Sequence, residues 1–292
     1  MAAPREKSRT LKKNRPQVLF LLLLFASSVL FFVIKNSKPF VYPINHSEQP
    51  SPVKYVEEKS KDLSKEVIQP EVIEHGSRLQ HKIALTFDAD MTVSMRNLYK
   101  NGKIKSLYNP EIKKTLDKEK ISATFFLTGL WVQAYPNQAK EIASDPLFEI
   151  GNHSLSHPAF TSNCFKLPFI DDTNDQNEIQ SAQKIIQDVT GVTPKYFRFP
   201  GGCYDNVDVK EVAMLGLKII HWDVVSGDAY FKTADQIVQN VLPKVRNGSI
   251  IVFHIHDGDF APATEDALLR IIPVLKKEGY QFVTITQMLS LQ

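Results

Sequence analysis

The chain has 292 residues, of which 43% are hydrophobic, so it has enough apolar material for one large core or two modest ones. Its formal net charge is only +3, and basic residues are concentrated in the first fifteen positions. No basic patch suited to a nucleic acid follows them, and we expect no nucleic-acid partner. The two cysteines, Cys164 and Cys203, are too few for a disulfide framework, and the sequence leaves open whether they pair.

Residues 17–34 form an almost uninterrupted apolar run that follows a basic segment, residues 1–16. At ~1.5 Å per residue, a helix of this length spans the hydrocarbon core of a bilayer. The preceding basic residues predict a cytoplasmic tail and an exported body, periplasmic or extracellular. A cleaved signal peptide, which would release a secreted protein, is the alternative. Its apolar region is usually shorter and ends in a small-x-small site, which residues 35–38 lack. We therefore expect an uncleaved membrane anchor.

Residues 35–78 differ in character from both neighbouring segments. Five prolines interrupt a charged, polar stretch that has no sustained hydrophobic periodicity. Such a composition is typical of an extended, flexible stalk. The remaining residues, 79–292, are then the folded domain.

Strand-like and helix-like patterns alternate through this domain. Apolar, β-branched or aromatic runs predict strands at residues 83–87, 121–127, 148–150, 196–199, 217–222, 250–254 and 281–285. Apolar stripes, proline starts and a glycine stop predict helices at residues 110–120, 136–144, 177–190, 206–215, 234–245 and 264–278.

This alternation predicts a parallel α/β fold, and either an open doubly wound sheet or a barrel fits it. Polar clusters follow most of the predicted strands. Because a barrel gathers the carboxyl ends of its strands around one mouth, we expect a distorted (β/α) barrel of about seven parallel strands. Two long stretches without a helical pattern, residues 91–109 and 159–175, are expected to be loops that shape a substrate groove.

A candidate metal site comes from two of these clusters. His153 and His157 follow a predicted strand, and one helical turn would place them on the same face. Asp88 and Asp90 follow the first predicted strand. One carboxylate with two imidazoles makes a three-ligand site with open positions, and the second carboxylate could act as a general base.

Two further clusters supply a fixed cation and an acid. Arg198 could form a bidentate pair with a carboxylate, and the glycines that follow it could line an oxyanion site or simply make a turn. His254 ends a predicted strand and suits a general acid. Asp228 or Asp223 could remain ionised beside it and raise its pKa.

Five short segments, in order along residues 79–290, resemble the motifs of the polysaccharide deacetylase family, the NodB-like carbohydrate esterases. Residues 153–157 match the His-Ser/Thr-x-x-His metal motif in full. Residues 86–88 are similar to the opening Thr-Phe-Asp-Asp-Gly motif and residues 198–200 to the Arg-x-Pro motif. Residues 222–228 and 248–254 resemble the fourth and fifth motifs. The resemblance implies a NodB-like fold and makes residues 79–292 the catalytic domain.

The resemblance also implies a role for each matching residue. Asp88 falls at the base and Arg198 at its partner, while His254 falls at the acid and Asp228 at the aspartate that supports it. His153 and His157 fall at metal ligands. Substrate or oxyanion contacts are expected from Pro200, Gly201, Gly202 and Trp222.

Some positions depart from the family pattern. Ala89 stands where the family has its metal-binding aspartate, so either Asp90 supplies the ligand through an altered backbone or two histidines and waters hold the metal. Ala229 and Gly201 replace a usual tryptophan and a frequent tyrosine, which leaves the choice of substrate in doubt. His256 has no family role.

The resemblance implies removal of N-acetyl groups from a glycan that contains N-acetylhexosamine, which releases acetate and leaves a free amine. Asp88 would deprotonate the attacking water and His254 would protonate the departing nitrogen. The implied cofactor is a divalent metal, zinc first, with cobalt or nickel as alternatives. Two other hypotheses stay open: a deformylase or amidohydrolase on a small or lipid-linked amide, and an inactive membrane-tethered carbohydrate-binding module, which Ala89 favours.

Overall fold

The structure, a computed structural model, describes residues 70–170, 174–258 and 260–290. The predicted cytoplasmic tail, the predicted membrane anchor at residues 17–34 and most of the predicted stalk lie outside these residues. Across the described ranges, no helix is long and apolar enough to span a membrane.

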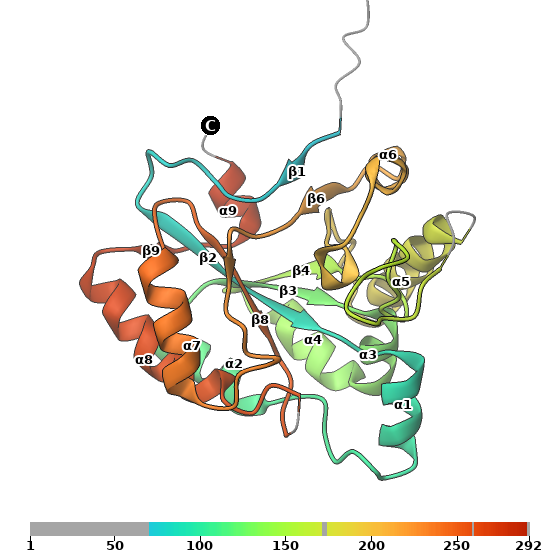
Figure 1. Ribbon diagram of the computed structural model, residues 1–292, viewed down its shortest axis with the longest axis horizontal. Coiled ribbons are helices and arrows are strands. Elements are labelled where there is room, and N and C mark those ends of the chain that lie inside the picture. The colour runs from blue at the N-terminus through green and yellow to red at the C-terminus, as the bar shows by residue number, and fades with distance from the viewer. Residues whose placement is uncertain (1–69, 171–173, 259, 291–292) are drawn as a thin grey trace, which may run out of the picture. The chain divides into compact units, whose positions relative to one another are not determined.

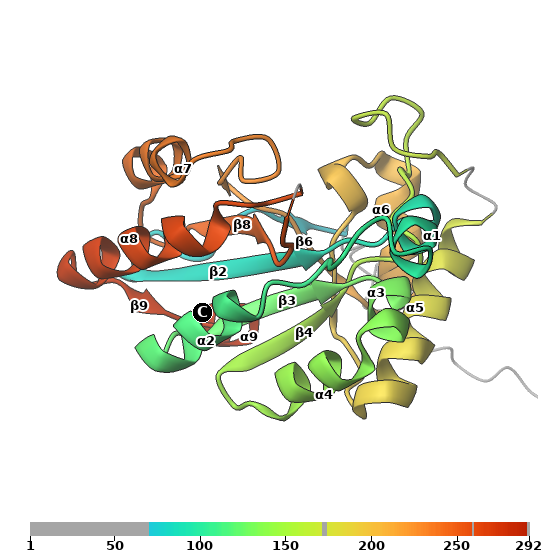
Figure 2. The ribbon, with the colours of Figure 1, turned by 90° about the horizontal axis from the view of Figure 1, so that it is seen from below.

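All strands of the described residues belong to one parallel sheet (Figures 1 and 2). Its strand order is β1-β6-β5-β4-β3-β2-β8-β7, and β9 pairs separately with β2. The strands are β1 (Val72–Ile73), β2 (Lys82–Ala89), β3 (Ala123–Leu127), β4 (Phe148–Asn152), β5 (Tyr196–Phe197), β6 (Lys218–Ile220), β7 (Val224–Val225), β8 (Ile250–His254) and β9 (Gln281–Phe282).

The connection between β6 and β7 shows that this sheet is strongly curled. The two strands are consecutive in the chain, yet six strand spacings separate them in the sheet order. In a flat sheet this separation would be ~29 Å, at ~4.8 Å per strand. The chain from Ile220 to Val224 spans at most about 14 Å. The sheet therefore curls back on itself, and the predicted parallel, distorted barrel is confirmed in this main feature.

Most helices lie around the outside of the curled sheet (Figures 1 and 2), whereas α9 contributes Ile285 and Met288 to the cluster inside the curl. All six predicted helices are present, and their ends differ from the predicted ones by at most four residues, although the segment at residues 234–245 finishes in a short 3-10 turn. The helices are α1 (Val93–Lys100), α2 (Pro110–Glu119), α3 (Gly129–Ala134), α4 (Pro136–Ser144), α5 (Asp175–Thr190), α6 (Asn206–Met214), α7 (Ala234–Val241), α8 (Thr264–Lys277) and α9 (Ile285–Leu289), with 3-10 turns η1 (Pro200–Gly202) and η2 (Leu242–Lys244).

Three predictions about local structure are wrong. Residues 91–109 contain α1, which begins because the Thr92 side chain accepts a hydrogen bond from the Met95 amide. The strand predicted at 281–285 has only two residues, because Thr284 caps α9 in a capping box. Residues 72–78, assigned to the stalk, belong to the fold: β1 pairs with β6, and Arg78 forms an ion pair with Asp223 at 2.7 Å.

The central strand β2 has two buried faces, and this determines where its polar side chains point. Its odd-numbered residues 83–89 join the large apolar core that the outer helices cover. Ala84 belongs instead to a smaller cluster with Phe126 of β3 and Ile250 of β8, inside the curl of the sheet. Since side chains alternate along a strand, Thr86 and Asp88 also face the inside of the curl. The carboxyl end of β2 therefore presents its carboxylate to the interior of the barrel.

Candidate active site

Polar side chains from four strands converge at the carboxyl end of the barrel. Asp88 on β2 lies opposite His254 in the register with β8. His153 directly follows β4, and Arg198 directly follows β5. Because all these strand pairs are parallel, the strands have their carboxyl ends at the same end of the sheet (Figure 2).

Asp90, His153 and His157 form the candidate metal centre. The Oδ1 atom of Asp90 lies 3.3 Å from Nε2 of His153 and 3.3 Å from Nε2 of His157. Among the described residues, this is the one group of three or more metal-ligating side chains whose ligand atoms all lie within 4.8 Å of one another. A carboxylate and two imidazoles match the ligands that zinc and neighbouring transition metals prefer.

The donor atoms of this centre are ready for a cation. Nδ1 of His153 lies 2.8 Å from the carbonyl oxygen of Arg198, which can only accept, so Nδ1 carries the hydrogen and Nε2 a lone pair. That Nε2 and the facing Oδ1 of Asp90 are both buried, and neither has a hydrogen-bond partner among the described residues. Two lone pairs facing each other are unfavourable unless a positive charge lies between them. The three residues therefore fit a divalent metal.

The pKa values of Asp90 and His153 also indicate a site that favours positive charge. Burial alone would raise the pKa of Asp90, but the attraction of His157 and the contacts with His153 and His157 hold it well below its usual range. Burial alone would lower the pKa of His153, but the charges of Asp88 and Asp90 raise it above its ordinary value. The site thus favours positive charge, whether a proton or a metal ion supplies it.

The histidine segment is a loop, so the predicted helical turn is wrong. Ser154 and His157 have left-handed backbone, with φ of 67° and 57°. The Asn152 side chain accepts the amide hydrogen of Ser154 at 2.9 Å, and the Ser154 hydroxyl accepts that of His157 at 3.1 Å. These two tight turns, rather than a helix, bring both imidazoles to one side.

The structure places Asp90, and not Ala89, beside the two histidines. Ala89 ends β2 and is fully buried in the outer apolar core. Asp90, the next residue, directs its carboxylate toward the histidines. A residue two positions from Asp88 shares its face in an extended chain, so the alternation rule alone could have selected Asp90 over an empty ligand position.

Asp88 and Arg198 form a fully buried ion pair. One guanidinium nitrogen, Nη1, donates to Oδ1 of Asp88 at 2.7 Å and to the hydroxyl of Thr86 at 2.9 Å. Oδ2 of Asp88 lies 3.8 Å from Nε2 of His153. Arg198 thus fixes one carboxylate oxygen and leaves the other beside the metal centre.

Arg198 is itself held from several sides. Its guanidinium also donates to the carbonyls of Ile220 and His221, at 3.3 and 3.1 Å. The ring of Phe126 lies 4.0 Å from its central carbon and that of Trp222 lies 5.3 Å away. Trp222, predicted to contact substrate, is half-buried and packs on this guanidinium.

His254 and Asp228 form the second polar pair. Nδ1 of His254 lies 2.8 Å from Oδ1 of Asp228, whose carboxylate also accepts from the hydroxyls of Ser226 and Thr264. Burial would lower the pKa of His254, but the charge and hydrogen bond of Asp228 raise it to about 10. The ring is therefore protonated at neutral pH, with Nε2 3.6 Å from Oδ2 of Asp90.

Asp223 does not join this pair, so that alternative for the support of His254 is wrong. Its carboxylate binds Arg78 and accepts from the amide of Ile250, at the start of β8. It therefore belongs to the opposite end of the strand from His254.

The glycine turn after Arg198 has the tight geometry that its sequence suggests. Gly201 and Gly202 have φ of 64° and 69°, and Pro200 begins the turn. The Gly202 amide donates to the carbonyl of Phe199 at 2.9 Å, so it does not point at an acyl oxygen as predicted. The oxyanion role of Gly201 stays a prediction.

A disulfide ties the loop after the histidines to this turn. Cys164 and Cys203 are bonded, which resolves the pairing that the sequence left open. A Cβ atom on Gly201 would lie only 2.7 Å from the sulfur of Cys164, so the disulfide-linked loop packs directly against the glycine. The usual tyrosine at this position would have no room.

Sequence reasoning missed Thr264 and assigned no role to His256. Thr264 begins α8 and donates to Oδ2 of Asp228 at 2.8 Å, far from it in sequence. His256 lies two residues beyond His254, and its Nε2 is 3.9 Å from Oδ2 of Asp90. The His-x-His spacing was a visible signal for the second residue, whereas nothing in the sequence marks the first.

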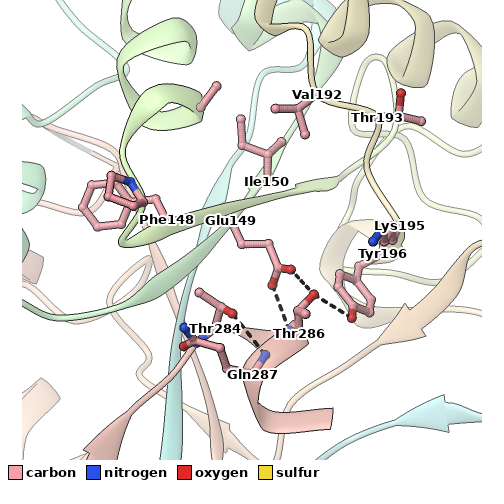
Figure 3. A pocket seen from close by; sticks show the side chains of 12 residues that line it. Phe148, Glu149, Ile150, Val192, Thr193, Lys195, Tyr196, Thr284, Thr286 and Gln287 are labelled. Carbon is pink, nitrogen blue, oxygen red and sulfur yellow. Dashed lines mark hydrogen bonds between the residues drawn. The ribbon is translucent and has the colours of Figure 1, made fainter. Parts of the chain in front are cut away.

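A pocket of about 360 Å³ lies at the other end of the strands (Figure 3). Glu149 and Tyr196, near the amino ends of β4 and β5, line it together with residues near α9. The Glu149 carboxylate accepts hydrogen bonds from Thr124 and from the amide and hydroxyl of Thr286. Its acidic group is therefore already satisfied within the protein, and the pocket lining contains no histidine.

The family model and two relatives that match this chain all belong to the deacetylases. The polysaccharide deacetylase family model matches residues 75–220. A peptidoglycan-N-acetylglucosamine deacetylase of Bacillus cereus is 33% identical over 62% of this chain and 63% of its own length. The peptidoglycan-N-acetylmuramic acid deacetylase PdaA of Bacillus subtilis is 30% identical over 73% of each chain. The chain thus spans less than two thirds of the Bacillus cereus relative.

The solved structures that are similar to this chain include a deacetylase and a pseudoenzyme. The peptidoglycan N-acetylglucosamine deacetylase Bc1960 superposes with a TM-score of 0.64 at 29% identity, over 76% of this chain and 94% of its own. The Bacillus anthracis protein BA3943, described as a pseudoenzyme of carbohydrate esterase family 4, gives 0.61 at 27% identity, over 75% and 69%. A mutant of BA3943 with restored enzymatic activity gives 0.62 at 27% identity, over 75% and 71%.

Proposed function

Because this chain belongs to the polysaccharide deacetylase family, we propose that it is a metal-dependent hydrolase that removes N-acetyl groups from a glycan containing N-acetylhexosamine. The observation that carries the proposal is the placement of Asp90, His153 and His157 between two ion pairs, Asp88 with Arg198 and His254 with Asp228. This arrangement supplies metal ligands, a base and an acid at one place.

Asp90, His153 and His157 would hold the metal. We favour zinc, and cobalt or nickel would suit the same donors. A similar structure, the acetyl xylan esterase of Clostridium thermocellum at 28% identity and a TM-score of 0.57, over 72% of this chain and 90% of its own, contains a cobalt ion. When bound, the metal would polarise the acetyl carbonyl and make water more acidic.

Asp88 is the general base of the proposed reaction. Arg198 occupies its Oδ1, so Oδ2 is the atom that accepts a proton from the attacking water. Loss of this proton lets the water oxygen bond to the acetyl carbon.

His254 is the general acid. Asp228 holds the hydrogen on Nδ1 and stabilises the imidazolium, so Nε2 presents a second hydrogen to the leaving nitrogen. Transfer of that hydrogen accompanies cleavage of the carbon–nitrogen bond and leaves acetate and a free amine on the sugar.

An inactive carbohydrate-binding module is the alternative that the pseudoenzyme among the similar structures supports. We favour the enzyme because the substitution at Ala89 does not remove a carboxylate from the site: Asp90 lies beside both histidines. Binding alone requires neither a buried base with its arginine nor an acid with its aspartate. The deformylase or amidohydrolase hypothesis would use the same groups on another amide.

We propose a cell-wall glycan such as peptidoglycan as the natural substrate, on the precedent of the relatives' names. The site would then lie outside the cytoplasm, tethered by the apolar run at residues 17–34. The bond between Cys164 and Cys203 supports this location, because disulfides persist mainly in oxidising compartments.

The test is acetate release by the full-length, zinc-loaded protein from purified peptidoglycan and from chitin oligomers. Release from either, abolished by a chelator and restored by zinc, is expected. Metal-loaded protein that releases formate from a formylated amide but no acetate from glycans would favour the alternative enzyme. Metal-loaded protein that binds the glycans without any hydrolysis would favour the inactive module.

A further inference from the structure

His256 is buried beside the active site, with its hydrogen-bonding roles fixed by its surroundings. It is the second residue of the loop after β8 and is 3% exposed. Its Nδ1 lies 3.1 Å from the carbonyl oxygen of Leu107, and a carbonyl can only accept. The hydrogen of neutral His256 therefore lies on Nδ1, and Nε2 is an acceptor.

This acceptor points into the site, and no described residue satisfies it. Nε2 of His256 is buried, has no hydrogen-bond partner among residues 70–170, 174–258 and 260–290, and lies 3.9 Å from Oδ2 of Asp90. Nε2 of His254 lies 3.6 Å from the same oxygen. The two rings stack nearly parallel, with centroids 6.0 Å apart and planes at 19°. His256 thus faces the same space as the proposed acid, on the opposite oxygen of Asp90 from the metal-binding histidines.

The hydrogen-bonding capacity of Oδ2 of Asp90 and Nε2 of His256 determines which kind of group can bind to both atoms. Oδ2 of Asp90 and Nε2 of His256 are both acceptors, so they cannot bond to each other, but one hydrogen-bond donor can contact both. A cation is less suitable, because within the described ranges His256 does not join the compact group of ligand atoms around Asp90. The missing partner is therefore a donor such as a hydroxyl group.

We propose that His256 is a substrate-positioning residue that accepts a hydrogen bond from the 3-hydroxyl of the reacting N-acetylhexosamine. This inference rests on the proposed function, which places the amide nitrogen at His254. The acetamido group is on carbon 2, so its neighbours are carbons 1 and 3. In a polymer, carbon 1 forms the glycosidic bond, so carbon 3 bears the one neighbouring hydroxyl. That hydroxyl is close enough to the nitrogen for two adjacent imidazoles to serve both groups.

The proposal has a consequence for substrate choice. N-acetylglucosamine has a free 3-hydroxyl, whereas N-acetylmuramic acid carries an ether at that oxygen and offers no donor. A buried acceptor left without a partner costs binding energy. The chain should therefore prefer N-acetylglucosamine over N-acetylmuramic acid residues, and His256 should be responsible for that preference.

The experiment compares the full-length, zinc-loaded protein with His256→Phe, which keeps a planar ring but has no acceptor, and His256→Gln, whose side-chain oxygen can replace it. His75→Phe, at an exposed histidine in the amino-terminal segment of the fold, is the matched control. Three quantities are measured: bound zinc, affinity for N-acetylglucosamine tetramer by calorimetry, and kcat and KM on that tetramer and on acetanilide, an acetamide without hydroxyls.

For His256→Phe we expect unchanged zinc content, about tenfold weaker tetramer binding with a matching rise in KM, and unchanged kinetics on acetanilide. His256→Gln should recover most of the affinity, and His75→Phe should equal the wild type. Equal losses on both substrates, loss of zinc, or unchanged tetramer affinity would each overturn the proposal. If the wild type binds the tetramer without releasing acetate, the proposed function fails, but weaker binding by His256→Phe would still support the hydroxyl contact.

Discussion

The polar groups at the two ends of the barrel differ in whether their atoms have hydrogen-bond partners within the described residues. At the carboxyl end, Oδ1 of Asp90 and Nε2 of both His153 and His256 are buried, and the part of the chain that the structure describes offers them no hydrogen-bond partner. At the amino end, Glu149 lines a pocket of about 360 Å³, but its carboxylate accepts hydrogen bonds from Thr286 (Figure 3) and from Thr124. The carboxylate that lines the amino-end pocket is thus already hydrogen-bonded, whereas these three atoms at the carboxyl end are not.

This contrast indicates that a ligand binds at the carboxyl end of the barrel rather than at the amino end. A buried polar atom without a partner costs roughly 1–3 kcal/mol, so several such atoms together persist only where a ligand repays the cost. A satisfied carboxylate such as Glu149 contributes to stability and has no need of a ligand. Substitutions at the two ends should therefore separate activity from stability.

The largest effect is expected at a metal ligand. His153→Ala removes one of three protein donors, so zinc content should fall below one tenth of the wild-type value and acetate release to background. Atomic absorption on dialysed protein measures the first and an acetate assay the second. A variant that retains a full equivalent of zinc would remove His153 from the metal centre.

Loss of the base should reduce turnover and spare the metal. Asp88→Asn keeps the shape but cannot accept a proton, so kcat is expected to fall about 10²–10⁴-fold. Zinc content should stay close to that of the wild type, because in the proposed site Asp90 and not Asp88 supplies the carboxylate ligand. A kcat within threefold of wild type would exclude Asp88 as the base.

A smaller, pH-dependent effect is expected at the acid. The charge of Asp228 raises the pKa of His254 to about 10, so the wild-type acid stays protonated until the pH approaches that value. Asp228→Asn removes this stabilisation of the imidazolium, so the pKa should fall toward its ordinary 6.5. The alkaline limb of kcat/KM should then move to lower pH by more than one unit. Identical limbs in both proteins would show that Asp228 does not support the acid.

The smallest effect on activity is expected at the amino end. Glu149→Gln weakens the hydrogen bonds to Thr124 and Thr286 and should lower the free energy of unfolding by about 1–2 kcal/mol. Chemical denaturation measures this change. Because Glu149 is remote from the metal ligands, kcat/KM should remain within twofold. A tenfold loss of kcat/KM at unchanged stability would make the amino-end pocket part of the active site.

The fold and the polar pairs were largely predictable from the sequence. The apolar runs located the long strands, and their common direction placed Asp88, His153 and His254 at one end. The short strands β1 and β7 have two residues each, too few for a periodic pattern to register. Helix α1 was missed because its signal is a single capping threonine rather than a continuous apolar stripe.

The details of the site depended on contacts between distant residues. That Asp228 and not Asp223 supports His254 follows from Arg78, whose ion pair draws Asp223 to the other end of β8. The histidine loop depends on left-handed backbone at Ser154 and His157, which a motif does not reveal. His256 has its acceptor fixed by Leu107, 149 positions away in sequence.

The most direct test of the account measures zinc content and acetate release on the same sample of full-length protein. We predict one equivalent of zinc and release of acetate from N-acetylglucosamine oligomers that depends on it. Protein that takes up no zinc, cobalt or nickel, and releases no acetate after each has been added, would contradict the account: Asp90 would then not replace the missing aspartate, and the site would be that of a pseudoenzyme.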